Sequence, residues 1–201
     1  MRVLAEQEVQ VPASGQRSAE DERLLVAAAK ALDERAWETL FHQHYDQLRT
    51  YVRYRVGDAA VADDLASQVF AEAVAGIGKY RYRGIPIRAW LFRIARNLSN
   101  DYVRKERYRP DAALQLREAP SPLRLLERDL EVRQLTAALE RLTDEQRQVL
   151  VLRFILEHSV FETAETMSKS IGAVKTLQHR ALAAARRALA SIDPTSWGET
   201  S

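Results

Sequence analysis

At 201 residues and a net charge of +2, the chain is long enough for two small domains or one of medium size. Hydrophobic residues make up 46% and charged residues 29%, which is typical of a globular protein and excludes fibrous and disordered classes. Cysteine is absent, which excludes a disulfide scaffold, a thiolate nucleophile and a Cys-ligated zinc site. No apolar run reaches the roughly 18 residues that span a bilayer, and the first residues lack a signal-peptide core, so we expect a cytoplasmic protein.

The spacing of apolar residues predicts an all-α fold. Intervals of three and four indicate four helices in the first half of the chain: about Ser18 to Leu32, Glu34 to Arg55, the Gly57-Asp58 break to Ile77, and Ile87 to Arg107. No alternating strand pattern occurs anywhere. The first half therefore predicts a four-helix domain.

A proline-containing stretch separates this domain from a second one. Residues 108–122 hold Pro110, Pro120 and Pro122 among mixed charges and are the best candidate for a flexible linker. We expect a disordered extension over 1–19, a first domain over 20–107, a second domain over 123–192 and a disordered tail over 193–201. In the second domain, cap signals at Thr143, Ser159 and Ser170 predict three helices joined by tight turns, a helix-turn-helix unit.

Charge is distributed unevenly along the chain. Between Gly76 and Pro110, Lys and Arg are opposed only by Asp101 and Glu106, and a second basic stretch without acids runs over residues 169–187. The segment that precedes the first basic zone is acidic. Two basic zones beside an acidic one indicate a polyanionic partner and a second, different partner, and the alternative is ordinary solvated helix faces.

The fourth predicted helix has a polar face that suits DNA. Helical periodicity places Arg93, Arg96, Asn97, Asn100 and Arg104 opposite an apolar face that includes Trp90, Leu91, Ile94, Ala95, Leu98 and Tyr102. Arginine and asparagine pair with phosphates and base edges. The preceding loop alternates aromatic and basic residues at Tyr80, Arg81, Tyr82 and Arg83, a pattern that stacks on and holds a single strand. The alternative is that the tyrosines pack on the helix bundle.

Acidic and apolar residues mark the third predicted helix at Asp63, Asp64, Gln68 and Phe70. A metal or acid-base site is disfavoured, because a helix points adjacent carboxylates about 100° apart and no histidine stands nearby in sequence. A protein-docking face, or simple surface charge, is the better interpretation.

The last predicted helix has an inward side and a basic outward side. Ile171, Val174, Ala181, Ala185 and Leu189 share the inward side. The predicted DNA contacts are Ser170 at the cap, Gly172 and Ala173 at the edge, and Lys175, Thr176, His179 and Arg180 on the outward face. In a helix-turn-helix unit these N-terminal residues enter the major groove. No catalytic, phosphate-binding or metal motif occurs, so we expect no enzyme activity, no cofactor and no metal.

Several strings resemble the extracytoplasmic-function (ECF) sigma factors of the sigma-70 family. Ala62 to Phe70 resembles the polymerase-binding helix of sigma region two, and Tyr82-Arg83-Gly84 followed by Ala89 to Asn97 resembles its promoter-melting helix. The strings that resemble sigma region four are Leu139 to Arg147, Leu152 to Phe154, Gly172 to Thr176, and His179 to Ala181. One departure is Leu177-Gln178, which reverses the usual Arg-Leu order.

The resemblance implies a role for each set of residues. Asp63, Asp64, Gln68 and Phe70 would dock on the clamp helices of core RNA polymerase. The loop from Tyr80 and the basic helix face would open and hold the minus-ten strand, and the last helix would read the minus-thirty-five duplex of promoter DNA. An anti-sigma factor is a further implied partner, with the free chain a monomer. Two alternatives remain open: a dimeric helix-turn-helix regulator and a decoy that binds an anti-sigma factor.

Overall fold

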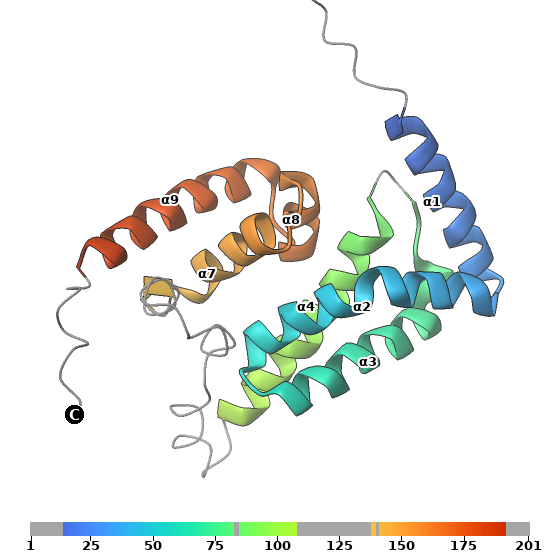
Figure 1. The fold of residues 1–201 in the computed structure, drawn as a ribbon, viewed down its shortest axis with the longest axis horizontal. Coiled ribbons are helices and arrows are strands. Elements are labelled where there is room, and N and C mark those ends of the chain that lie inside the picture. The colour runs from blue at the N-terminus through green and yellow to red at the C-terminus, as the bar shows by residue number, and fades with distance from the viewer. Residues whose placement is uncertain (1–13, 83–84, 108–137, 140, 192–201) are drawn as a thin grey trace, which may run out of the picture.

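The chain folds as an assembly of helices. The computed structural model describes residues 14–82, 85–107, 138–139 and 141–191, and all its regular elements are helical, as the sequence predicts. They are α1 (Ser14–Lys30), α2 (Glu34–Val56), α3 (Ala59–Gly76), η1 (Ile77–Lys79), α4 (Ile87–Arg107), α7 (Asp144–Leu150), η3 (Val151–Ile155), α8 (Val160–Met167) and α9 (Ile171–Ala190) (Figure 1). Within this described part, no helix is both long and apolar enough to cross a membrane.

The N-terminal unit contains α1 to α4, and its helix ends follow local sequence signals. Asp33 caps α2 by accepting from the Ala36 N–H at 2.9 Å. Gly57 ends α2 with a left-handed φ of 82°, which glycine adopts without a Cβ clash, and Asp58 then caps α3. Helix α1 begins upstream of the predicted Ser18, so the expected disordered extension over 1–19 is too long by six residues. The helix continues there through good helix formers such as Gln16 and Arg17.

The C-terminal unit contains α7 to α9. Thr143 and Ser159 form reciprocal capping boxes, and Ser170 accepts from the Ala173 N–H at 3.2 Å, so all three predicted caps are confirmed. In the turn between α8 and α9, Ser168 has a left-handed φ of 54°. This conformation costs a non-glycine residue about 1 kcal/mol. The helix-turn-helix geometry therefore forms without glycine in the turn. The predicted linker 108–122 and tail 193–201 lie outside the described residues.

The two units pack against each other through α4 and α8. Phe92 on α4 is fully buried, with its ring centroid 5.5 Å from that of Tyr51 and 4.3 Å from that of His158. Gln148 donates to the Tyr51 hydroxyl, and Arg88 donates to the Leu156 carbonyl. The sequence left the relative orientation of the two domains open, whereas the structure joins them in one continuous core.

This interface contains a histidine held in its neutral form. His158 is fully buried, and neither ring nitrogen has a hydrogen-bond partner among the described residues. Burial lowers the pKa of His158 to about 3, helped by the positive charge of Arg88. Burial likewise lowers the pKa of His44 on α2 to about 4, with Arg88 adding to it and Glu162 opposing it.

We call the arrangement in which the two units pack together the closed arrangement, and we expect it to lose stability in mild acid. Both folded-state pKa values lie below the unfolded value of about 6.5, so the stabilisation is complete above pH 6.5 and declines as the pH falls towards 4 and 3. In that window, each histidine lowers the free energy of unfolding by up to about 1.4 kcal/mol for each pH unit of acidification. Urea unfolding at pH 7.5 and 5.0 measures the loss. His158→Met, with an apolar side chain of similar size, should remove the part of the pH dependence of stability that His158 contributes. An unchanged pH dependence in this variant would contradict the assignment.

Candidate nucleic-acid interface

The polar face of α4 is divided between solvent and the neighbouring helices. Arg93, Asn97 and Arg104 are exposed, and Arg104 forms an ion pair with Asp101 at 3.0 Å. Arg96 and Asn100 are half-buried, and the Asn100 side-chain oxygen accepts from Arg55 Nη2 at 2.6 Å. The exposed stripe of α4 in this closed arrangement therefore consists of Arg93, Asn97 and Arg104.

Arg55 links this face to the C-terminal unit. Its guanidinium donates to Asn100 on α4 and to Asp144 at the start of α7. The same side chain thus bridges α2, α4 and α7. Opening the interface between the two units would release Arg55 from Asp144, whereas its hydrogen bond to Asn100 lies within the N-terminal unit.

The loop before α4 holds its two tyrosines differently. Tyr80 is only 5% exposed, its ring centroid lies 5.1 Å from that of Trp90, and its hydroxyl donates to the Ile85 carbonyl at 2.6 Å. The ring is therefore unavailable for stacking on a base here, as the bundle-packing alternative supposes. Tyr82 is half-buried and Arg81 is exposed. Arg83 lies outside the described residues.

The predicted docking residues on α3 face different surroundings. Asp63 forms an ion pair with Arg49, whose hydrogen bond lowers the pKa of that carboxyl. Asp64 is exposed, and so is Gln68, whose Nε2 donates to Glu72 at 3.3 Å. Asp63 is thus engaged on the protein, whereas Asp64 and Gln68 face solvent.

Phe70 on α3 forms the floor of an open apolar groove. It is 8% exposed and lies 4.9 Å from the Phe41 ring between centroids. The groove has a volume of about 430 Å³ and is lined by Trp37, Phe41, Phe70 and Val74, with Glu34 and Glu38 beside them. The groove therefore offers apolar area together with two carboxylates of α2 on one surface.

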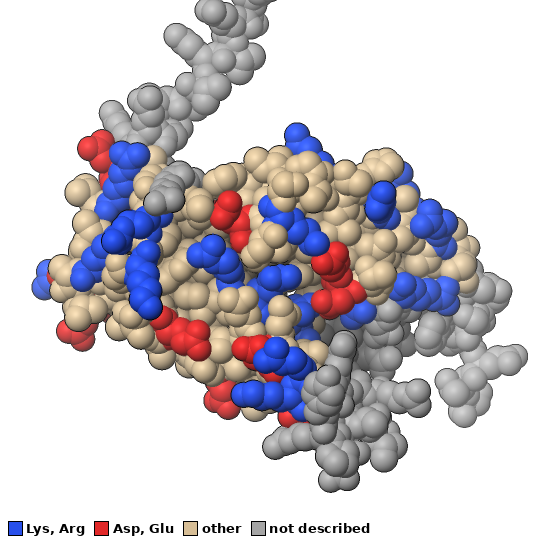
Figure 2. All heavy atoms as spheres, turned by 180° about the vertical axis from the view of Figure 1, so that it is seen from behind, with Lys and Arg blue, Asp and Glu red and all other residues tan. Residues whose placement is uncertain are grey.

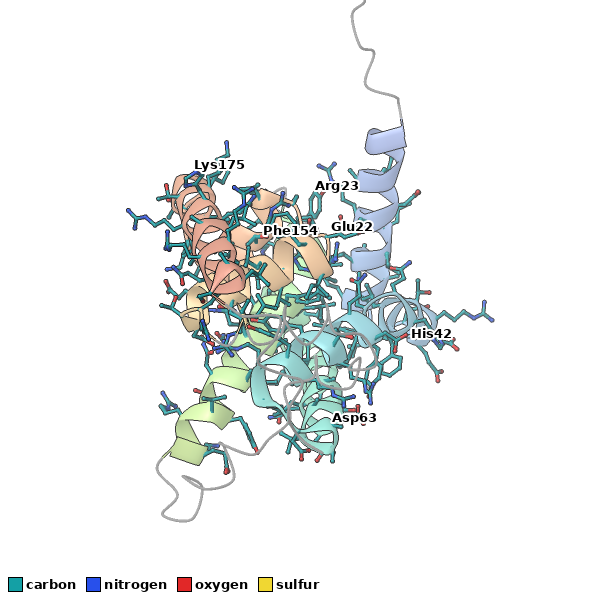
Figure 3. The ribbon with its side chains drawn as sticks, turned by 60° about the vertical axis from the view of Figure 1, so that its left-hand side comes forward. Glu22, Arg23, His42, Asp63, Phe154 and Lys175 are labelled. Atoms are coloured by element: carbon teal, nitrogen blue, oxygen red, sulfur yellow. The ribbon has the colours of Figure 1, made fainter. Side chains whose placement is uncertain are left out.

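Helix α9 presents every residue of its predicted reading face to solvent. Gly172, Ala173, Lys175, Thr176, His179 and Arg180 are all exposed, as is the capping Ser170. Figure 3 shows Lys175 pointing outward at the N-terminal end of the helix. Leu177 packs partly against the core, and Gln178 accepts from Arg153 Nε at 3.1 Å. The reversed Leu177-Gln178 pair therefore faces the protein and leaves the outward residues in place.

The inward side of α9 is shorter than the sequence predicts. Val174, Ala181 and Ala185 are buried, but Ile171 is 46% and Leu189 is 38% exposed. These two predictions are wrong because they lie at the ends of a 20-residue helix that packs on the much shorter α7 and α8. Figure 1 shows the C-terminal end of α9 extending past α7.

Basic groups occur at both ends of the molecule. On the face drawn in Figure 2, Lys and Arg side chains lie at both ends and also across the middle, where they are mixed with Asp and Glu. Basic and acidic groups are therefore interspersed between the two ends of this face.

Comparison with known proteins shows which family has this sequence and fold. A model of sigma-70 region 2 matches residues 40–109, and a model of sigma-70 region 4 matches residues 132–184. The ECF RNA polymerase sigma factor SigD of Mycobacterium tuberculosis is 33% identical over 168 residues, which cover 79% of each chain. The chain belongs to the ECF sigma factor family. The ECF RNA polymerase sigma factor BldN of Streptomyces coelicolor is 38% identical over 170 residues, which cover 82% of this chain but 64% of that protein.

Solved structures agree on the fold of this ECF sigma factor. CnrH in complex with the cytosolic domain of CnrY matches with a TM-score of 0.65 and 27% identity, covering 86% of this chain and 99% of CnrH. The sigma factor RpoE of Bartonella quintana, in complex with the anti-sigma factor NepR, matches with a TM-score of 0.58 and 20% identity, covering 78% and 98%. The second likeness bears on the fold alone.

The sequence analysis missed the residues that join the two sigma regions. Phe92 and Ser99 are fully buried on α4, although they fall outside its predicted apolar face. Arg88, at the start of the same helix, binds the Leu156 carbonyl and lies 3.8 Å from Glu162. The signal was available, because Phe92 and Ser99 stand three residues before and four residues after Ala95 and so border the predicted apolar face of α4.

Proposed function

We propose that this ECF sigma factor binds core RNA polymerase and directs it to promoters, holding the minus-ten strand with α4 and reading the minus-thirty-five duplex with α9. One observation carries the proposal: each matched sigma region contains one helix with an exposed Arg, Lys or Asn face. The chain supplies binding and the polymerase supplies the chemistry, so this role needs no enzyme activity. Because core polymerase works in the cytoplasm, we place the chain there.

The minus-ten surface is assigned to α4 and the loop before it. Arg93, Asn97 and Arg104 face solvent, where they can pair with phosphates and base edges. Arg81 and Tyr82 flank the entry to the helix, and we assign Tyr82 rather than the buried Tyr80 to base stacking. Arg96 and Asn100 are half-buried beside this surface, and Arg55 of the same unit donates to Asn100.

Core polymerase is assigned to the surface of α3. Asp64 and Gln68 offer exposed polar contacts, and the groove over Phe70 offers apolar area lined also by Glu34 and Glu38. A face that combines apolar area with acidic groups suits a helical partner that carries basic side chains. Asp63 contributes through its ion pair with Arg49, which fixes α3 against α2.

The minus-thirty-five element is assigned to the first three turns of α9. Lys175 and Arg180 have the donors that pair with guanine O6 and N7, and the backbone N–H groups at the Ser170 cap suit a phosphate. The two binding domains are then residues 14–107, which include the start of α1, and residues 123–192, with 108–122 as the linker between them.

An anti-sigma factor is the proposed regulatory partner. CnrH is solved in complex with the cytosolic domain of CnrY, so a sigma factor of this fold accommodates a second chain. We propose that such a partner holds the two domains in the closed arrangement seen here, with the free chain otherwise monomeric.

Core binding separates this function from its rivals. Sedimentation of the purified chain with core polymerase should give a one-to-one complex, and the chain alone should sediment as a monomer. A stable dimer that ignores core would support a conventional helix-turn-helix regulator. A chain that binds core but never yields promoter-dependent transcripts would support the decoy and contradict the proposal.

A further inference from the structure

The first N–H groups of α4 find their acceptors in two different parts of the chain. The carbonyl of the preceding residue, Pro86, accepts from the Ala89 N–H at 3.0 Å, but its side chain has no group that could cap the Ile87 N–H. Glu22 on α1 supplies that group: its Oε1 accepts from the Ile87 N–H at 2.6 Å. A carboxylate at a helix N-terminus also interacts favourably with the helix dipole. The cap of the proposed melting helix thus comes from a residue 65 positions earlier in the chain.

The neighbouring residue of α1 holds the loop before α4. The Arg23 guanidinium carbon lies 5.0 Å from the centroid of the Tyr82 ring. About two helical turns further along α1, Lys30 Nζ lies 6.0 Å from the Tyr80 ring centroid. Contacts of this kind restrain the rings through cation–π attraction. Figure 3 shows Glu22 and Arg23 extending from α1 towards the body of the molecule.

Packing holds α1 in the position that these contacts require. Val26 and Ala29 are buried on the same side of the helix, and the Trp37 indole N–H donates to the Ala29 carbonyl at 3.0 Å. Glu22 is half-buried, and burial raises the pKa of its carboxyl while the Ile87 N–H opposes that shift. Glu20, by contrast, is exposed on the same helix.

We propose that α1 positions the promoter-melting elements, with Glu22 fixing the start of α4 and Arg23 fixing the orientation of Tyr82. Both are positioning residues, because they act through the helix and the tyrosine rather than on DNA. The inference rests on the proposed function and extends it to an element outside the matched region 2, which begins at residue 40. Loss of Glu22 would leave the reading surfaces intact but misplaced.

The test is the affinity of holoenzyme for a single-stranded oligonucleotide that carries the minus-ten element. Glu22→Ala should weaken this affinity about tenfold, the effect of losing a helix cap, while the affinity for core polymerase stays unchanged. Glu22→Gln keeps an oxygen that accepts from the Ile87 N–H and should restore the affinity to within about threefold of wild type. Glu20→Ala, on the same helix, is the matched control and should behave as wild type.

Each outcome has a distinct meaning. Unchanged oligonucleotide affinity in Glu22→Ala overturns the inference and leaves the proposed function standing. An equal loss of core affinity also overturns it, because it shows general destabilisation. Failure of wild-type holoenzyme to bind any minus-ten strand overturns the proposed function instead. Should Glu22→Ala not fold, Arg23→Met removes only the cation over Tyr82 and should weaken the oligonucleotide complex about threefold.

Discussion

Replacing Arg93 and Asn97 together by alanine is expected to reduce promoter-dependent transcription by about 100-fold, because each lost base or phosphate contact costs about 1–3 kcal/mol. Both side chains are exposed on α4, so their removal should not disturb folding. Run-off transcription with reconstituted holoenzyme measures the loss, and the affinity for core polymerase should stay at the wild-type value.

A control variant on α2 and a second double variant on α9 test whether the loss is specific to the exposed face of α4. Arg35→Ala, which removes an exposed arginine from the first turn of α2, is the matched control and should transcribe normally. Lys175→Ala with Arg180→Ala should weaken binding to minus-thirty-five duplex, whereas the α4 pair should weaken binding to the melted strand. Wild-type transcription from the Arg93 and Asn97 double variant would contradict the assignment of the minus-ten surface.

Truncating Phe92 to alanine is expected to lower the free energy of unfolding by about 3–5 kcal/mol. The side chain is fully buried and contacts Tyr51 on α2 and His158 from the C-terminal unit, so the cavity would lie where the two units meet. A small protein is stable by only about 5–15 kcal/mol, so this loss is a large fraction of the total. Urea unfolding at pH 7.5 measures it.

The control for Phe92 is the same truncation on the surface. Phe154 is 54% exposed, so Phe154→Ala should change stability by no more than about 0.5 kcal/mol. Phe92→Leu, which fills most of the space, should cost about 1.5 kcal/mol or less. A loss below 1 kcal/mol in Phe92→Ala would show that the two units do not share a core in solution.

The helices and their ends were predictable because their signals are local. The Gly57-Asp58 pair and the caps at Thr143, Ser159 and Ser170 act within three residues of where they stand. The face of α9 was predictable for the same reason: a helix repeats every 3.6 residues, so the outward position of Lys175 follows from the buried Val174 and Ala181.

The junction between the two domains was not predictable in this way. Phe92 and His158 lie in different domains, and nothing in either local sequence shows that their rings meet. The Glu22 cap of α4 is equally long-range. Pro86 predicts where the helix starts, but nothing near it in sequence predicts that Glu22 accepts from the Ile87 N–H. Asn100 was expected to face DNA, whereas its side-chain oxygen accepts a hydrogen bond from Arg55. Helical periodicity predicts the side of α4 on which Asn100 lies but not which residue of another helix packs there.

Run-off transcription on a fragmented genomic library, with core polymerase in the presence and absence of this chain, tests the central claim most directly. The account predicts discrete transcripts that depend on both components and begin downstream of a shared two-part motif. The chain alone should open no DNA. Background transcription on every fragment, from a preparation shown to bind core polymerase, would contradict the claim that this protein directs promoter-specific initiation.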